Sequence, residues 1–239
     1  MDCKEEERRT AELLGMEAVE CLHRARVAVF GVGGVGGYAC EALARAGVGH
    51  LTLVDSDTVS LSNINRQIIA LHSTVGRAKV EVMRERITDI NPECEVEAIN
   101  AFYLPENADA IPLTGYDYIV DAIDLVSCKL DLCETARRLQ IPLIMALGTG
   151  NKLDPTLLQV TDISKTSGCP LARVMRKELR NRGISNQKVV FSPEEPHVTT
   201  QLETPPPGRR SVPASTPWVP ATAGLLIGSA VVRDLIKNL

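Results

Sequence analysis

The chain has 239 residues, of which 44% are hydrophobic, and this length suits one large domain or two small ones with a substantial core. A net charge of −4 gives no general attraction to nucleic acid, although a local basic face is compatible with it. The seven cysteines are scattered and form no C-x-x-C pair, which argues against a structural zinc site. The amino terminus (MDCKEEERRT) is highly charged and contains no recognisable signal peptide, so we expect a cytoplasmic protein.

Hydrophobic periodicity predicts alternating strands and helices up to residue 150. After a helix over residues 8–24, the predicted strands cover residues 26–30, 50–54, 95–100, 116–121 and 142–147. The predicted connecting helices cover residues 35–46, 78–91 and 128–139. This alternation favours an α/β fold with a Rossmann-like, mostly parallel sheet and helices on both faces. A nucleotide would then bind at the carboxyl ends of the strands.

The pattern changes after residue 150, where we expect a smaller α+β extension within one integrated domain. Its predicted elements are strands at 159–163 and 188–192 and helices at 170–182 and 222–237. Residues 192–220 hold eight of the 14 prolines, which predicts an extended loop and excludes helix or central strand. The apolar run at 219–232 is shorter than the about 20 residues that a membrane span needs, so we expect a buried helix, with peripheral membrane association as the less favoured alternative.

Residues 27–38 read VAVFGVGGVGGY, an apolar strand followed by a glycine-rich turn and the start of a helix. The spacing Gly31-x-Gly33-x-x-Gly36, with a further glycine at Gly34, is a phosphate-binding fingerprint in this context. Glycines permit a tight turn, let the backbone approach phosphate oxygens, and let helix and strand pack closely. The turn alone predicts a nucleotide, with a dinucleotide as the first candidate.

Polar residues downstream change the predicted ligand. Asp55 follows the second strand, where a carboxylate binds the ribose of NAD or ATP equally well. The next loop carries Asn63, Arg66 and Gln67, and Lys79 opens the following helix. A dinucleotide needs little beyond backbone and helix dipole, whereas a triphosphate suits an arginine and a lysine. The cluster therefore favours ATP, with ordinary surface charge as the open alternative.

The fourth predicted strand ends in Asp121-Ala-Ile-Asp124. Two carboxylates at a strand end suit Mg²⁺, which favours one or two carboxylates together with phosphate oxygens. A buried acid that caps the next helix is the alternative for either residue.

Five motifs occur in an order and at spacings that resemble the ubiquitin-activating-enzyme-like (ThiF-type) adenylyltransferase superfamily over roughly residues 9–150. They are GVGGVG, the pair Asp55-x-Asp57, SLSN–NRQ at 60–67, TVGRAKVE at 74–81 and the D-x-x-D at 121–124. That superfamily binds ATP and adenylates a carboxylate.

The resemblance assigns roles to individual residues. It places Arg66 and Lys79 on the phosphates of ATP and Asp124 on Mg²⁺, and these three are the expected catalytic residues. It places Asp55 on the ribose, with Asn63 and Gln67 as loop contacts. In dimeric members an amino-terminal arginine reaches the partner subunit's ATP, which implies a homodimer and corresponds to Arg9 here.

The second half resembles tRNA threonylcarbamoyladenosine dehydratases through GTGNKLDPT at 148–156, VTDISKT at 160–166 and CPLARVMRKELR at 169–180. The implied reaction is ATP-dependent ring closure of a threonylcarbamoyl-modified adenosine in a tRNA anticodon loop, through adenylation of its carboxylate. The sequence leaves open whether a monovalent cation (K⁺ or Na⁺) binds near Gly148 and Gly150. It also leaves open whether a sulfur-transfer protein is a partner. Cys169 lies where related enzymes place an acyl-accepting cysteine, but this reaction needs no thiolate and an incidental buried cysteine is favoured.

Three alternatives compete with this function. An adenylyltransferase that activates the carboxyl terminus of a sulfur-carrier or ubiquitin-like protein would share every nucleotide residue, but such enzymes usually carry two C-x-x-C pairs. An NAD-dependent oxidoreductase would leave Arg66 and Lys79 without a role. A non-catalytic module would not need intact phosphate and metal residues.

A tRNA substrate needs a basic surface, and the predicted helix at 170–182 offers one. Its basic residues follow helical spacing on one face: Arg173, Arg176, Lys177 and Arg180. Lys152 and Lys165 are expected to extend this patch. A solvated helix face without a partner is the alternative.

Overall fold

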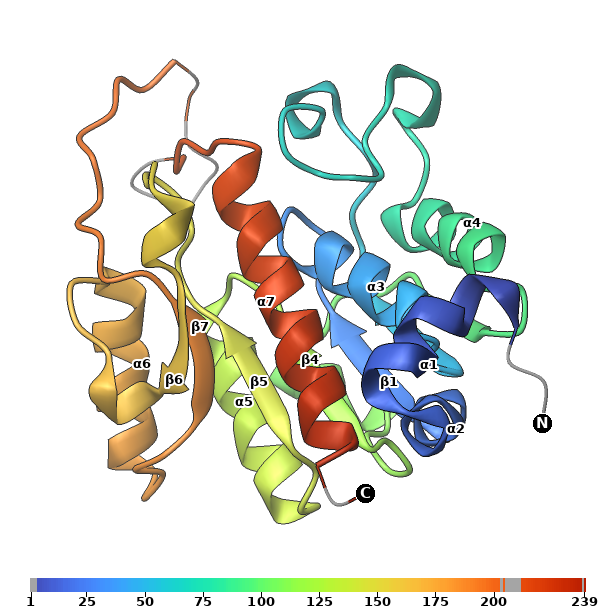
Figure 1. Ribbon diagram of the computed structural model, residues 1–239. Coiled ribbons are helices and arrows are strands. Elements are labelled where there is room, and N and C mark those ends of the chain that lie inside the picture. Colours follow the sequence, from blue (N-terminus) through green and yellow to red (C-terminus); the bar gives the residue numbers. More distant parts are fainter. Residues whose placement is uncertain (1–3, 203, 205–211, 238) are drawn as a thin grey trace.

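The computed structural model describes residues 4–202, 204, 212–237 and 239, in which seven strands form one sheet of order β3-β2-β1-β4-β5-β7-β6 (Figure 1). The strands are β1 (Arg26–Phe30), β2 (His50–Val54), β3 (Glu95–Ile99), β4 (Tyr118–Asp121), β5 (Leu143–Ala146), β6 (Gln159–Asp162) and β7 (Lys188–Phe191). β6 pairs antiparallel with β7, and every other pair is parallel. The predicted α/β fold with a mostly parallel sheet is confirmed.

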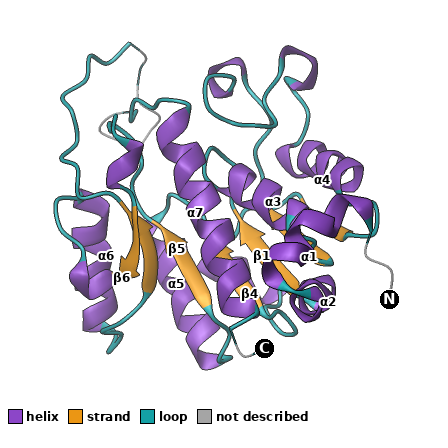
Figure 2. Cartoon of the chain, in the orientation of Figure 1, coloured by secondary structure: helices purple, strands orange, loops and turns teal. Residues whose placement is uncertain are grey.

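Helices cover both faces of this sheet (Figures 1 and 2). The described helices are α1 (Arg8–Leu14), α2 (Met16–Arg24), α3 (Gly36–Arg45), α4 (Lys79–Ile90), α5 (Val126–Arg138), α6 (Pro170–Asn181) and α7 (Trp218–Leu235). Helices α2, α3, α4 and α7 pack on one face, and α5 and α6 pack on the other. Strand β1 contributes side chains to the hydrophobic cores on both faces. Val27 and Val29 pack on the first face, and Ala28 and Phe30 pack on the second.

Helix α7 lies against α3 at close range. A Cβ at Gly224 would come within 2.3 Å of the Val35 carbonyl oxygen, and one at Gly228 within 2.5 Å of the Ala42 Cβ. The two glycines are four residues apart and therefore share one helix face. They let α7 bury its apolar run on α3, as the prediction of a buried helix required. Within the described residues, none of the helices combines the length and apolar character that a membrane crossing needs.

Two predictions at the ends of the chain were wrong in detail. The helix expected over residues 8–24 is broken at Gly15, whose φ of +90° interrupts it, and Leu13 before the break is 83% exposed. Helix α7 begins at Trp218, inside the stretch expected to be loop, with Pro220 in its first turn. Proline is tolerated there because the first N–H groups of a helix have no intrahelical partner. Residues 203 and 205–211 of the predicted loop lie outside the described residues.

Candidate active site

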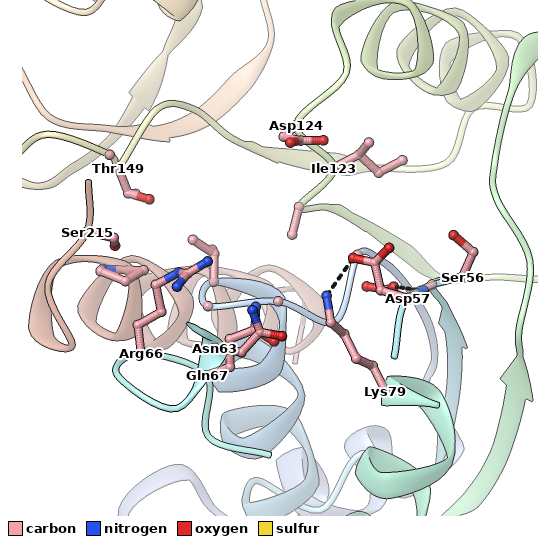
Figure 3. A pocket seen from close by; sticks show the side chains of 18 of the residues that line it. Ser56, Asp57, Asn63, Arg66, Gln67, Lys79, Ile123, Asp124, Thr149 and Ser215 are labelled. Carbon is pink, nitrogen blue, oxygen red and sulfur yellow. Dashed lines mark hydrogen bonds and ion pairs between the residues drawn. The ribbon is translucent and has the colours of Figure 1, made fainter. Parts of the chain in front are cut away.

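A cavity of about 430 Å³ opens at the carboxyl ends of the strands, beside the point where the order reverses between β1 and β4 (Figure 3). Its walls come from the glycine turn, the loops that follow β2 to β5, and residues 212–220. The predicted site residues that line it are Gly31, Gly33, Gly34, Asp55, Asp57, Asn63, Arg66, Gln67, Lys79 and Asp124. Gly36, Arg9 and the basic residues of α6 do not line it.

The glycines of the turn have two different roles: some are required for packing, and one faces the cavity. Gly31 has a φ of +89°, and a Cβ there would lie 2.7 Å from the Ala122 carbonyl oxygen. A Cβ at Gly36 would lie 1.8 Å from the Gly31 carbonyl oxygen, so Gly36 packs the helix on the turn. At Gly33 the nearest atom to a Cβ is Gln67 Nε2 at 3.9 Å, because this glycine faces the open cavity. Gly33 is thus where backbone could meet phosphate.

Asp55 ties the glycine turn to the loop after β2. Its carboxylate accepts hydrogen bonds from the backbone N–H of Val32 at 2.7 Å and of Asp57 at 2.8 Å. A carboxylate offers about four acceptor positions, so ribose hydroxyls could still be bound. The residue therefore fixes the turn that its predicted ligand would contact.

Lys79 begins α4 and is 5% exposed, with its ammonium 2.6 Å from the carboxylate of Asp57 (Figure 3). The Lys79 backbone N–H also donates to the Asp57 carbonyl at 3.0 Å. An ammonium has three donors, so it can keep Asp57 and still bind a phosphate oxygen. Asp57 thereby sets the position of the lysine in the cavity wall.

Three polar side chains, Asn63, Arg66 and Gln67, form the wall beside the glycine turn (Figure 3). Asn63 lies in the short 3₁₀ turn η2 (Leu61–Asn63), and its Oδ1 accepts from the Ser60 N–H at 3.1 Å. Arg66 donates to the Ser62 carbonyl at 2.8 Å and to Asn65 Oδ1 at 2.9 Å. Gln67 Oε1 is buried with no hydrogen-bond partner among the described residues.

Of the two aspartates at the end of β4, only Asp124 lines the cavity, so the alternative of a buried acid applies to Asp121. Asp121 is fully buried, and its Oδ1 accepts from Lys129 Nζ at 3.0 Å and from the Ile123 N–H at 3.1 Å. Burial raises the pKa of Asp121, and the Lys129 ammonium opposes that shift. Across the described ranges, no group of three or more His, Cys, Asp or Glu side chains is placed to hold a metal. A Mg²⁺ here would depend on Asp124 and phosphate oxygens.

Several lining residues were not predicted from the sequence. Phe102 and Tyr103 follow β3, and Thr149 follows β5, so the rule that ligands meet strand ends could have found them. The Tyr103 hydroxyl donates to Asp131 at 2.7 Å; burial, together with that carboxylate, raises the pKa of Tyr103. Val212, Pro213 and Ser215 come from the proline-rich stretch, and no sequence signal points to them.

The basic patch on α6 is smaller than predicted. Arg173, Lys177 and Arg180 are exposed, but Arg176 is partly buried and donates to the carbonyl and hydroxyl oxygens of Thr166, both at 2.6 Å. Arg176 therefore fastens α6 to the preceding segment.

Lys152 was also expected in the patch, and it is 2% exposed. Its ammonium donates to the carbonyl oxygens of Ser192 at 2.6 Å and Glu194 at 2.9 Å, and burial lowers its pKa. Lys165 is exposed. Cys169 is buried at the residue that precedes α6.

The ThiF family model matches residues 6–239. The chain belongs to the ThiF family. A tRNA threonylcarbamoyladenosine dehydratase of Bacillus subtilis is 45% identical over 235 residues, which cover 95% of this ThiF-family chain and 92% of the relative. The resemblance predicted from the motifs is confirmed.

Solved structures agree with this assignment. A crystal structure of the E. coli tRNA N6-threonylcarbamoyladenosine dehydratase in complex with ATP has a TM-score of 0.87 and 38% identity, covering 100% of this chain and 98% of that chain. The same E. coli enzyme in complex with AMP has a TM-score of 0.86 and 39% identity, covering 97% and 94%. Both nucleotides are ones that an adenylating enzyme would hold before and after its reaction.

Proposed function

We propose that this ThiF-family chain is an ATP-dependent dehydratase that closes a ring on threonylcarbamoyladenosine in tRNA. One observation carries the proposal: a single cavity brings Arg66, Lys79 and Asp124 around the glycine turn. Relatives that match almost the whole chain have this activity in their names, and one has been solved with ATP. An oxidoreductase would leave all three side chains without a role.

The first step adenylates the substrate. An oxygen of the threonyl carboxylate attacks the α-phosphorus of ATP, and pyrophosphate leaves. The protein supplies positive charge at the phosphates: Arg66 as a bidentate donor and Lys79 as a point charge. Backbone at Gly33 approaches the same oxygens. Mg²⁺, held by Asp124 and the phosphates, would neutralise charge on the leaving pyrophosphate.

The second step closes the ring. An atom of the carbamoyl group attacks the activated carbonyl carbon, AMP leaves, and the net change is the loss of one water. Both reacting groups belong to one substituent, so the step benefits from high effective molarity. The enzyme needs no nucleophile of its own, which agrees with a structural place for buried Cys169.

We propose that the tRNA backbone docks on the exposed basic residues of α6, Arg173, Lys177 and Arg180. Four further features remain predictions from the sequence. They are a homodimer with Arg9 at the partner's nucleotide, a K⁺ or Na⁺ site, a sulfur-transfer partner and a cytoplasmic location.

An AMP-release assay tests this function. Radiolabelled ATP and Mg²⁺ are supplied with tRNA that carries the threonylcarbamoyl group, with tRNA that lacks it, or with a sulfur-carrier protein. We expect AMP only with the modified tRNA, together with a nucleoside that has lost one water. AMP formed only with the carrier would support the alternative adenylyltransferase, and NADH binding without ATP turnover would refute both.

A further inference from the structure

One wall of the cavity has no role in the chemistry above. It is a short segment, residues 212–216, which we call the strap. The strap precedes α7, and Val212, Pro213 and Ser215 from it line the cavity. Figure 3 shows Ser215 near Thr149 and Arg66, on the side of the cavity away from Lys79.

Asn151 holds the strap from the β5 side. Its backbone N–H donates to the Ala214 carbonyl at 2.7 Å, and its Oδ1 accepts from the Ala214 N–H at 2.7 Å. Asn151 has a φ of +59°, a left-handed conformation that asparagine, aspartate and glycine tolerate best. Gly150 leaves room for this contact, because a Cβ there would lie 2.7 Å from Pro213 Cβ. The Asn151 carbonyl also accepts from the His197 N–H at 2.8 Å.

Asn65 holds the strap from the opposite side. Its Nδ2 donates to the Ser215 carbonyl at 3.0 Å, and its Oδ1 accepts from Arg66. The strap thus bridges the loop after β5 and the loop that carries the proposed phosphate-binding arginine. Just beyond it, the Trp218 indole N–H donates to the Leu153 carbonyl at 2.7 Å. Side chains at both ends fix a segment that has no secondary structure of its own.

We propose that the strap excludes water from the acyl-adenylate, so that ring closure outcompetes hydrolysis, and that Asn151 is the positioning residue that keeps it closed. The inference rests on the proposed function. An acyl-adenylate has two fates. Attack by the carbamoyl group releases AMP and the cyclic product, whereas attack by water releases AMP and returns the original carboxylate. Arg66, Lys79 and the glycine turn promote AMP formation in both cases, so they cannot favour one fate over the other. A wall that keeps water away from the acyl-adenylate can favour ring closure over hydrolysis.

Two substitutions at one position separate the side-chain bond from the backbone conformation. Asn151→Gly keeps the left-handed φ and removes the oxygen that accepts from Ala214. Asn151→Asp keeps both the left-handed φ and a side-chain oxygen that can accept from the Ala214 N–H. Val198→Ala is the matched control, because Val198 is fully exposed in the stretch that leads to the strap.

The readout is the ratio of AMP released to cyclic product formed with modified tRNA. We expect a ratio near one for the natural chain, Asn151→Asp and Val198→Ala, and at least a threefold excess of AMP for Asn151→Gly. A purely structural defect would lower both products together and leave the ratio unchanged. Hydrogen exchange, which needs no turnover, should be faster at the Ala214 amide in Asn151→Gly alone.

The outcomes distinguish the two proposals. If the natural chain forms no AMP with modified tRNA, the proposed function fails. If it couples the two products and Asn151→Gly does so equally well despite faster exchange at Ala214, the role of the strap is refuted. Should Asn151→Gly fail to fold, Asn65→Ala removes the opposite anchor from an exposed position and must raise the ratio; an unchanged ratio would also overturn the inference.

Discussion

Replacing Lys129 with methionine should leave the carboxylate of Asp121 buried without its cation. Both side chains are completely buried, and Lys129 also donates to the Ala146 carbonyl at 2.8 Å, so it joins the ends of β4 and β5. The loops after these strands carry Asp124 and Thr149. Breaking such a pair from one side typically costs about 3–5 kcal/mol of folding free energy.

The cost should depend on pH with a definite sign. Without Lys129, burial raises the pKa of Asp121 with only the Ile123 N–H to oppose it, so this pKa lies further above the unfolded value of about 3.9 than in the natural chain. The folded state then binds a proton that the unfolded state releases, so stability is lost as pH rises. The penalty therefore grows with pH, by at most about 1.4 kcal/mol per pH unit, and is larger at pH 7 than at pH 5.

Urea unfolding of the natural chain and Lys129→Met at these two pH values measures the effect. Asp121→Asn combined with Lys129→Met is the control, because a neutral amide needs no proton and most of the stability at pH 7 should return. A loss below about 1 kcal/mol, or one that is equal at both pH values, would refute the argument that the ion pair neutralises a buried charge.

Three further outcomes are expected. Gly33→Ala should keep the melting temperature and lower AMP formation at least tenfold, because the added methyl enters open cavity; unchanged turnover would show that backbone at Gly33 does not meet phosphate. Gly224→Ala should destabilise the fold by about 1–3 kcal/mol in urea unfolding, because its Cβ would collide with the Val35 carbonyl, and no loss would contradict that packing. Arg173→Glu with Lys177→Glu should raise KM for tRNA several-fold and leave KM for ATP unchanged, whereas Arg176→Glu should lower stability; tRNA kinetics that ignore the first pair would rule out α6 as the docking surface.

Local signals in the sequence predicted most of the sheet and much of the cavity. The segment from β1 through the glycine turn could be predicted from neighbouring residues alone, because the apolar strand, the spaced glycines and the helix follow one another directly. Asp55, Arg66 and Lys79 could be found because they lie at a strand end, in the loop after it and at the start of the next helix, and parallel strands gather such positions at one edge.

Contacts between distant segments could not be predicted in this way. Asp121 and Asp124 look equivalent in sequence, and only the approach of Lys129 from α5 separates a structural carboxylate from one in the cavity. Lys152 reads as a surface charge until the carbonyl oxygens of Ser192 and Glu194 surround it. The strap has no motif, and its place is fixed by side chains far away along the chain.

In the proposed reaction, the substrate carboxylate attacks the α-phosphorus of ATP in this cavity. Modified tRNA whose threonyl carboxylate contains a heavy isotope of oxygen tests it in one turnover, with mass spectrometry of the released nucleotide. We expect one heavy oxygen to appear in the phosphate of AMP while the cyclic product forms. Heavy oxygen in inorganic phosphate, with ADP as the nucleotide product, would contradict it.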